Sequence, residues 1–429
     1  MEGEEHSGAA KYKAEILRKM GGKAKSVYTL NDNEIHVLAG KEDIADFCYY
    51  LHDSFGAKLV TVVCSDERQV DRGFVLRYVF AKEKDDVFVF VTAEIRKDAE
   101  LSFPSIASRI PSAALYEREV KDMFGLLPEG NPDTRTLVLH EQWPADVHPL
   151  RKDFAVSTKV GRVHDSQYPF TKVEGEGVCE IPVGPVHAGI IEPGHFRFSV
   201  LGENIVNLET RLFYTHKGIE KLAEGMKLDQ ALLLSERIAG DETVANSMAY
   251  CQAIEKIARA RVPKKALQTR TVCAEMERIY NHLGTLAGMS TDVGFAYGAA
   301  RLNILKERMM RLNEQVSGSR LLFGVNRIGG TGIDLKDKAQ LVTTTNLVLE
   351  DFKRVVSMLR SKSSVMDRLR NTGTISRQVA VDLGLVGVAA RCAGVDIDTR
   401  RDHPYAVYSS LRLDRHHDTP QHTMEYEVE

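Results

Sequence analysis

The pattern of apolar and polar positions divides the chain into a strand-rich first part and a helix-rich second part. Three short runs in the first part, 59–63, 73–80 and 87–92, are rich in β-branched and aromatic residues, which predicts strands of a small sheet. The segments 44–55 and 105–123 are predicted to be helices that pack on this sheet. The pattern therefore predicts an α+β domain over about the first 155 residues.

The second part changes from a strand pattern to a helical one. The segment 194–215 has apolar residues at strand spacing and predicts a hairpin. A helical run containing Tyr250, Ile254 and Ile257 follows, and Pro263 is expected to end it because proline clashes with the preceding turn. Successive amphipathic helices predict a bundle. The further stripes lie within 276–286, 302–316 and 348–359.

A polar stretch with little periodicity separates the two parts and predicts a linker. We therefore expect a flexible tail at 1–10, a first domain at 11–155, a linker at 156–177 and a second domain at 178–429. The tail is acidic and small, which is not the basic and then apolar pattern of a secretory signal.

Composition narrows the possible functions. The 57 basic residues nearly balance the 60 acidic ones, so no overall field favours nucleic acid or anionic lipid. Apolar runs such as 87–91 and 383–390 are far shorter than the roughly 20 residues of a membrane helix, so any membrane connection is expected to use partner subunits. The six cysteines contain no Cys-x-x-Cys pair, which argues against a zinc ribbon, an iron–sulfur site or a disulfide framework.

A long string near the end of the first domain carries a resemblance to a known family. It consists of 116–125 (YEREVKDMFG), 131–135 (NPDTR) and 148–154 (HPLRKDF). It resembles the small peripheral-arm subunit family of respiratory complex I, the family adjoining the large quinone-site subunit. The charged residues between Glu117 and Asp122 suit either a docking surface or a solvated helix.

The second domain resembles the family shared by the complex I quinone-site subunit and the nickel–iron hydrogenase large subunit. Among these, the fused subunits of formate-hydrogenlyase-type (group 4, membrane-bound) hydrogenases are most similar, and they have the same domain order. The resemblance implies a hydrogenase-large-subunit-like domain with a β hairpin and a helical bundle. The strings that carry it are 184–187, 192–197, 211–224, 277–282, 327–330 and 398–405.

The segment 237–243 (RIAGDET) departs from the hydrogenase pattern. The corresponding hydrogenase segment, Arg-x-Cys-Gly-x-Cys, supplies two thiolates to the metal centre, and Ala239 and Glu242 stand at those positions here. A second thiolate pair of that family has no counterpart before Glu429. A methyl group and a carboxylate do not replace soft thiolate ligands. We therefore expect that the nickel–iron site is lost and that the chain by itself has no hydrogenase activity.

The quinone-site pattern is also incomplete. Complex I has a tyrosine in the same turn, where this chain has Gly240, and a second histidine in the loop where residues 188–191 follow His187. The sequence therefore matches the architecture of both families and the active site of neither.

Several residues could still carry chemistry. Glu192 lies near the position of a hydrogenase glutamate that passes protons, and it is either a proton carrier or a solvated loop carboxylate. Arg237, Asp241 and Glu242 either line the emptied cavity and form a proton path with Glu192, or the two acids simply stabilise a helix N-terminus.

The histidines also leave two interpretations open. His187 and His195 could bind a quinone carbonyl or relay protons, or they could satisfy loop backbone groups. His416, His417 and His422 could bind a metal or belong to a flexible tail, and we predict no metal site.

The resemblance implies a cytoplasmic-arm subunit of a membrane-bound, complex I-like oxidoreductase related to energy-converting hydrogenases. In such complexes electron transfer is coupled to proton or ion translocation, with the arm at the cytoplasmic side of the inner membrane. The expected partners are an iron–sulfur small subunit with a [4Fe-4S] cluster and membrane ion-translocating subunits, and quinone binding stays open.

The resemblance also bears on cofactors. NAD binding is a family term, but the chain has no Gly-rich nucleotide loop, so NADH would bind another subunit. We expect no cofactor bound directly by this chain. The alternative to an electron-transfer role is a non-catalytic assembly subunit.

Overall fold

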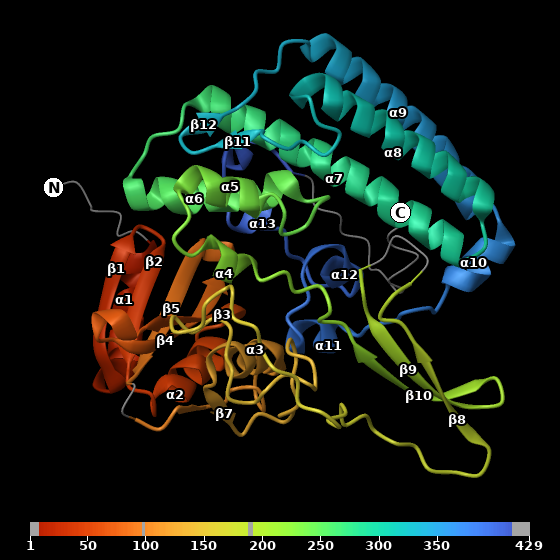
Figure 1. Ribbon diagram of the computed structural model, residues 1–429. Coiled ribbons are helices and arrows are strands. Elements are labelled where there is room, and N and C mark those ends of the chain that lie inside the picture. The colour runs from red at the N-terminus through yellow and green to blue at the C-terminus, as the bar shows by residue number, and fades with distance from the viewer. Residues whose placement is uncertain (1–7, 97–98, 188–191, 414–429) are drawn as a thin grey trace. The chain divides into compact units, whose positions relative to one another are not determined.

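The computed structural model describes residues 8–96, 99–187 and 192–413 (Figure 1). Its contacts divide the chain into two compact units, Met1–Leu222 and Ala223–Glu429. No helix in the described ranges combines the length and apolarity needed to cross a bilayer. The sheet of the first unit and the helices of the second confirm the predicted α+β class.

The first unit is built on a five-stranded sheet in the order β1-β2-β5-β4-β3. Strands β2 and β5 pair in parallel, and the other neighbours are antiparallel. The three predicted strands are confirmed, whereas β1 and β2 were not foreseen. The strands are β1 (Ala24–Asn31), β2 (Glu34–Ala39), β3 (Lys58–Glu67), β4 (Gly73–Lys82) and β5 (Val87–Ile95).

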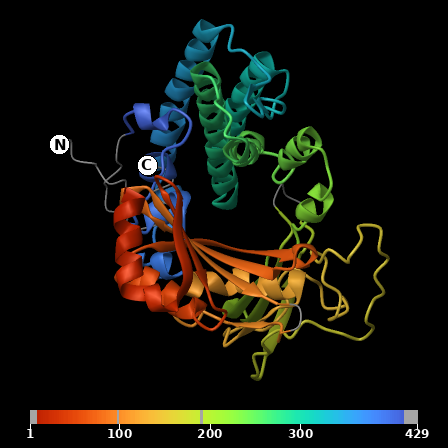
Figure 2. The ribbon, with the colours of Figure 1, turned by 90° about the vertical axis from the view of Figure 1, so that its left-hand side faces the viewer.

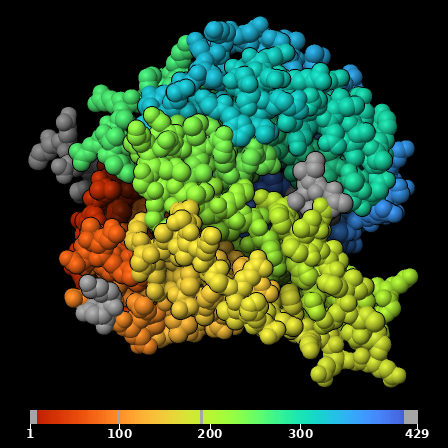
Figure 3. Space-filling view, viewed as in Figure 1, coloured from red at the N-terminus to blue at the C-terminus, as the bar shows by residue number. Residues whose placement is uncertain are grey.

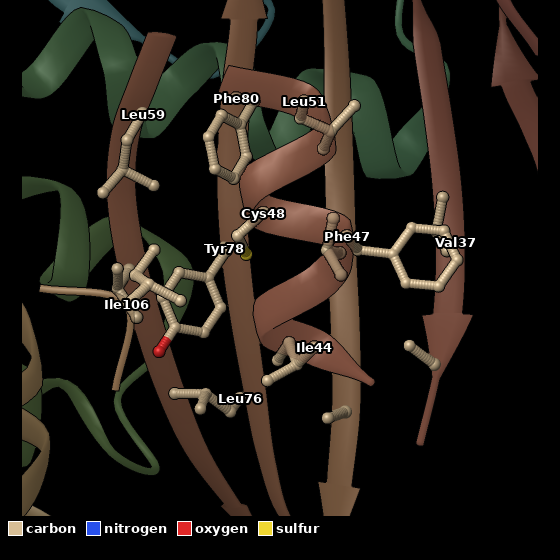
Figure 4. Packing of buried hydrophobic residues seen from close by; sticks show 14 of the residues in the cluster. Val37, Ile44, Phe47, Cys48, Leu51, Leu59, Leu76, Tyr78, Phe80 and Ile106 are labelled. Carbon is tan, nitrogen blue, oxygen red and sulfur yellow. The ribbon is translucent and has the colours of Figure 1, made fainter. Parts of the chain in front are cut away.

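Three helices pack on this sheet and share its core (Figure 2). They are α1 (Gly8–Met20), α2 (Ile44–Tyr49), which continues as a π-helical turn over Tyr50–Ser54, and α3 (Ala114–Phe124). Figure 4 shows the side chains of Phe47, Cys48 and Leu51 on α2 lying against sheet residues such as Tyr78 and Phe80. Burying these apolar side chains supplies the main stabilisation of the unit.

Two boundaries differ from the sequence prediction. The helix expected over 105–123 begins only at Ala114, because Pro111 disfavours helical geometry in the residue before it and a short 3-10 turn intervenes. Residues 8–10, expected in a flexible tail, form the first turn of α1, where Ala9 is fully buried.

A second, three-stranded antiparallel sheet completes the first unit, in the order β10-β9-β8. Its strands are β8 (Val178–Val183), β9 (His195–Leu201) and β10 (Asn204–Arg211), and the last two confirm the predicted hairpin. Arg211 on β10 binds the carboxylate of Glu141 at 2.7 Å, which ties this sheet to the preceding segment. The linker 156–177 contains no helix or strand, as expected, and the domain boundary assigned to it stays a prediction. The remaining elements are β6 (Ser102–Pro104), β7 (Leu127–Glu129) and α4 (Ile219–Ala223).

The second unit is mostly helical, and the buried stripes on its three long helices confirm the predicted bundle. These helices are α7 (Lys264–Asp292), α8 (Ala296–Ser317) and α9 (Lys338–Arg360). The others are α5 (Leu228–Ser235), α6 (Thr243–Ala258), α10 (Ser363–Leu369), α11 (Arg377–Asp382), α12 (Gly387–Cys392) and α13 (Thr399–Asp402), with the short strands β11 (Asn326–Arg327) and β12 (Gly330–Thr331).

Helix α6 buries a different face from the one predicted. Ile257 is 80% exposed, and the buried apolar side chains are Val244, Met248 and Cys251. The helix ends at Ala258 through a left-handed residue, so Pro263 precedes α7 and does not end α6. The predicted stripe was wrong because the buried face of this helix includes polar positions.

Candidate functional site

The charged turn of α3 is directed inward. Glu117 is fully buried and accepts hydrogen bonds from the Tyr78 hydroxyl at 3.1 Å, the Ile106 N–H at 2.9 Å and the Asn131 amide at 2.9 Å. The Ser105 hydroxyl donates a fourth bond. Both interpretations offered for this turn, docking surface and solvated helix, are therefore wrong for Glu117 and for the similarly buried Arg118 and Asp122.

The other charges of this turn hold an irregular segment against the helix. One oxygen of Asp122 accepts the N–H groups of Leu137, Val138 and Leu139 at 2.8, 2.9 and 3.2 Å. Arg118 donates to the carbonyls of residues 135 and 136, each at 3.1 Å. The string that resembles the complex I small-arm subunit thus organises backbone that has no sheet or helix partners of its own among the described residues.

The two candidate histidines of the first unit bind loop backbone. His187 Nε2 donates to the Gly194 carbonyl at 2.7 Å, and His195 Nδ1 donates to the Gly184 carbonyl at 3.2 Å. These contacts match the simpler of the two interpretations. His195 is 9% exposed, and its Nε2 has no hydrogen-bond partner within the described ranges, so a quinone or proton-relay role stays a prediction.

Glu192 is an exposed loop residue of the first unit, and the preceding residues 188–191 lie outside the described residues. Arg237, Asp241 and Glu242 belong to the second unit. A single proton path that joins Glu192 to them therefore stays a prediction. The three histidines near the end of the chain, His416, His417 and His422, also lie outside the described residues.

A polar hollow of about 620 Å³ lies beside β9 in the first unit. Its walls carry stacked pairs: the Arg211 guanidinium lies 4.2 Å from the Tyr168 ring centre, and that of Arg197 lies 4.9 Å from the Phe170 ring centre. Two acids, Glu141 and Glu180, neutralise these cations at 2.7 and 2.6 Å. His195 also lines the hollow, which sequence reasoning did not foresee.

The turn that replaces the thiolate segment joins α5 to α6 in the second unit. Asp241 and Glu242 are exposed and immediately precede the first helical residue, Thr243, as predicted. Arg237 is also exposed, and its guanidinium lies 5.1 Å from the centre of the Phe323 ring. The structure thus brings together three of the candidate residues on one short turn.

One face of α7 grips this turn. Glu277 accepts the N–H groups of Val244 and Ala245, the first turn of α6, at 2.7 and 2.9 Å. One turn further along, the Tyr280 hydroxyl and the Asn281 amide both donate to the Asp241 carbonyl. Positions i, i+3 and i+4 share one helix face, so α7 binds both the donors and the acceptor of the turn.

Two buried carboxylates flank the turn, and sequence reasoning assigned neither a role. Glu277 is 4% exposed, and burial raises its pKa to about 7, helped by the negative charge of Glu242 and opposed by the two N–H bonds. Glu236 is 2% exposed, accepts the Gly324 N–H at 2.7 Å and has its pKa raised by burial. The available signal was an acid next to the apolar stripe position Met276.

A buried ion pair holds the neighbouring loop. Arg270, which is fully buried, and Glu255 each contribute two polar atoms to the pair, at 3.0 and 2.6 Å. Glu255 also accepts the Gly329 N–H at 2.7 Å, and Arg270 donates to the carbonyls of residues 327 and 330. The string 327–330 is therefore fixed by side chains from α6 and α7.

The donor chemistry of the turn does not fit a nickel–iron centre. Ala239 offers no donor atom and Glu242 offers a hard carboxylate where soft thiolates are required. Within the described ranges, histidine, cysteine and acidic side chains form no group of three that could hold a metal.

Two family descriptions match the chain. Residues 37–160 match "Respiratory-chain NADH dehydrogenase, 30 Kd subunit", and residues 292–422 match "Respiratory-chain NADH dehydrogenase, 49 Kd subunit". A chain from the membrane-bound sulfane sulfur reductase, an archaeal respiratory membrane complex, shares the fold with a TM-score of 0.54 at 24% identity, over 59% of this chain and 71% of that one.

Curated relatives cover most of the chain. Hydrogenase-4 component G of Escherichia coli is 36% identical over 86% of this chain and 64% of its own length. Formate hydrogenlyase subunit 5 of the same organism is 34% identical over 87% and 66%. The fused C/D protein of the NADH-quinone oxidoreductase of Bdellovibrio bacteriovorus is 26% identical over 91% and 70%.

The chain thus spans slightly less than two thirds of the length of the first two relatives. Both family descriptions occur in one chain, in the order of the fused relatives. The chain belongs to the family in which complex I 30 Kd-type and 49 Kd-type domains are fused in one chain, together with group 4 hydrogenase large subunits.

Proposed function

We propose that the chain is an arm subunit of a membrane-bound, complex I-like oxidoreductase that couples electron transfer to proton or ion movement without a nickel–iron site of its own. The observation that carries the proposal is the turn before α6, which keeps its helix contacts but has Ala239 and Glu242 at the thiolate positions. The fused domain order and the names of the relatives support it.

The chemistry of the turn suits proton transfer. Arg237, Asp241 and Glu242 are exposed, and Glu236 and Glu277 are buried beside them with raised pKa values. Carboxyl groups in such surroundings exchange protons near neutral pH. Electron transfer is assigned to a [4Fe-4S] cluster in an iron–sulfur partner subunit, and NADH to another subunit.

An exposed apolar face supports docking to partner subunits. Strands β8–β10, yellow-green in Figure 3, carry apolar side chains on one face of the sheet, because residues two apart point to the same side. Ile181, Val183 and Leu208 are 47%, 39% and 47% exposed. We propose that the partners are the iron–sulfur subunit and membrane ion-translocating subunits on the cytoplasmic side of the inner membrane.

A second candidate is a purely structural assembly subunit. It is favoured by the α3 string, whose charges are used for internal hydrogen bonds. The two candidates differ in whether the turn takes part in turnover.

Substituting the candidate proton residues in the assembled complex separates the two functions. Arg237→Ala and Glu192→Ala are each expected to lower turnover at least about tenfold, as removal of proton-transfer groups commonly does. The measurement is turnover of the purified complex after its composition has been checked by gel electrophoresis, and Glu314→Ala, on the exposed face of α8, is the control. Unchanged turnover in an intact complex would assign the chain the assembly role.

A further inference from the structure

Glu277 occupies the point at which the turn meets α6. Its two oxygens each accept one backbone N–H of the first helical turn, at 2.7 and 2.9 Å. These N–H groups have no carbonyl partner within α6, because the first residues of a helix lack one. A carboxylate therefore holds this helix end from a neighbouring helix, and no side-chain cap is supplied by Glu242 itself.

The surroundings of Glu277 leave its charge weakly compensated. From the segment before α6, Glu242 contributes a like charge. On α7 itself, Arg278 is the one opposing charge that acts on it among the described residues, and the Cys273 thiol and Tyr280 phenol are neutral neighbours. The adjoining loop presents Asn326, which donates to the Val244 carbonyl at 2.9 Å and does not titrate.

We infer that Glu277 is the proton-accepting residue of this turn, and that its protonation changes how α6 holds the segment 239–242. This inference rests on the proposed proton-transfer function and names the residue that serves it. Glu277 acts by accepting a proton from water at the exposed Asp241 and Glu242 side of the turn.

The proton balance gives the structural consequence. One proton binds one carboxyl oxygen, and the side-chain charge goes from −1 to 0. That oxygen becomes an O–H donor and stops accepting an N–H bond, so either Val244 or Ala245 loses its partner. The helix end also loses the anion that its dipole favours. Proton uptake therefore loosens the first turn of α6, and proton release tightens it.

The test is a pH titration of the full chain by carboxyl ¹³C NMR together with amide hydrogen exchange. We expect a Glu277 midpoint at about 7, against an ordinary value of 4.5, and a signal that disappears in Glu277→Gln. After correction for intrinsic rates, Val244 and Ala245 should exchange faster at pH 6 than at pH 8 in the wild type and equally in Glu277→Gln. A midpoint near 4.5, or amide protection that ignores pH, overturns the inference.

Two further variants keep the result interpretable. Glu242→Gln removes the like charge and should move the Glu277 midpoint to lower pH without removing the carboxyl group. Glu314→Gln, an exposed acid of α8, should leave the midpoint unchanged. If Glu277 titrates and loosens the turn as expected while Glu277→Gln leaves the turnover of the complex unchanged at every pH, the inference about the turn stands and the proposed proton-transfer function fails.

Discussion

Replacing Arg270 with methionine is expected to lower the free energy of unfolding of the second unit by about 3–5 kcal/mol. Arg270 is fully buried, and its partner Glu255 has a side chain that is 7% exposed. Removing the cation leaves the Glu255 charge buried without compensation and frees the carbonyls of residues 327 and 330. The loop 327–330 should therefore lose its anchor.

Urea unfolding followed by far-ultraviolet circular dichroism measures this effect, because most of the helix lies in the second unit. Arg311→Met is the matched control, since that side chain is 71% exposed in an i, i+4 pair with Glu307 and should change stability by less than about 0.5 kcal/mol. Adding Glu255→Met to Arg270→Met should recover part of the loss. Equal, small effects of Arg270→Met and Arg311→Met would contradict the buried-pair interpretation.

Replacing Glu117 with glutamine is expected to lower the free energy of unfolding of the first unit by about 2–4 kcal/mol. The carboxylate accepts four hydrogen bonds, two on each oxygen. Glutamine presents an NH₂ group to one of these donor pairs, so buried donors lose their acceptor. The cost is large because such groups are not rehydrated inside the core.

The single tryptophan of the chain, Trp143, belongs to the first unit and reports its unfolding by fluorescence. Glu119→Gln is the control: Glu119 is half-buried, and its pKa is raised by burial and then by the charges of Glu220 and Asp122. Removing that charge relieves repulsion, so Glu119→Gln should not destabilise the unit at pH 7. A loss as large as that of Glu117→Gln would show that the hydrogen-bond network is not the cause.

Buried Glu277 should also leave a signature in the stability of the chain. Because its folded pKa is raised from 4.5 to about 7, the folded state binds this proton more tightly than the unfolded state. The stabilisation is fully present below pH 4.5 and is lost as pH rises toward 7. Glu277→Gln should flatten this part of the pH dependence of the unfolding free energy, measured in urea at a series of pH values.

The sequence predicted elements whose apolar period is strong. Strands β3–β5 and helices α7–α9 were foreseen because their buried positions follow one period without interruption. Strand β1 was missed because it is largely exposed and carries few apolar residues at alternate positions. Helix α6 was placed with the wrong face inward because one of its buried positions is Glu255, which a pattern of apolar residues does not detect.

The candidate site was predicted in part for a related reason. The turn with Asp241 and Glu242 was placed correctly before a helix, because departures from a known string are local features of sequence. Glu236 and Glu277 were missed because the burial of an acid depends on which distant backbone donors reach it. Gly324 and Val244, which supply those donors, lie 88 and 33 residues away along the chain.

The metal content of the complex tests the proposed loss of the nickel–iron site most directly. The full-length protein would be purified with its partner subunits through a tag on this chain, and nickel and iron would be counted per chain by elemental analysis. We expect iron from the partner's cluster and nickel far below one atom per chain, because Ala239 and Glu242 supply no thiolate. Nickel close to one atom per chain would contradict the proposal that this turn has exchanged metal binding for proton transfer.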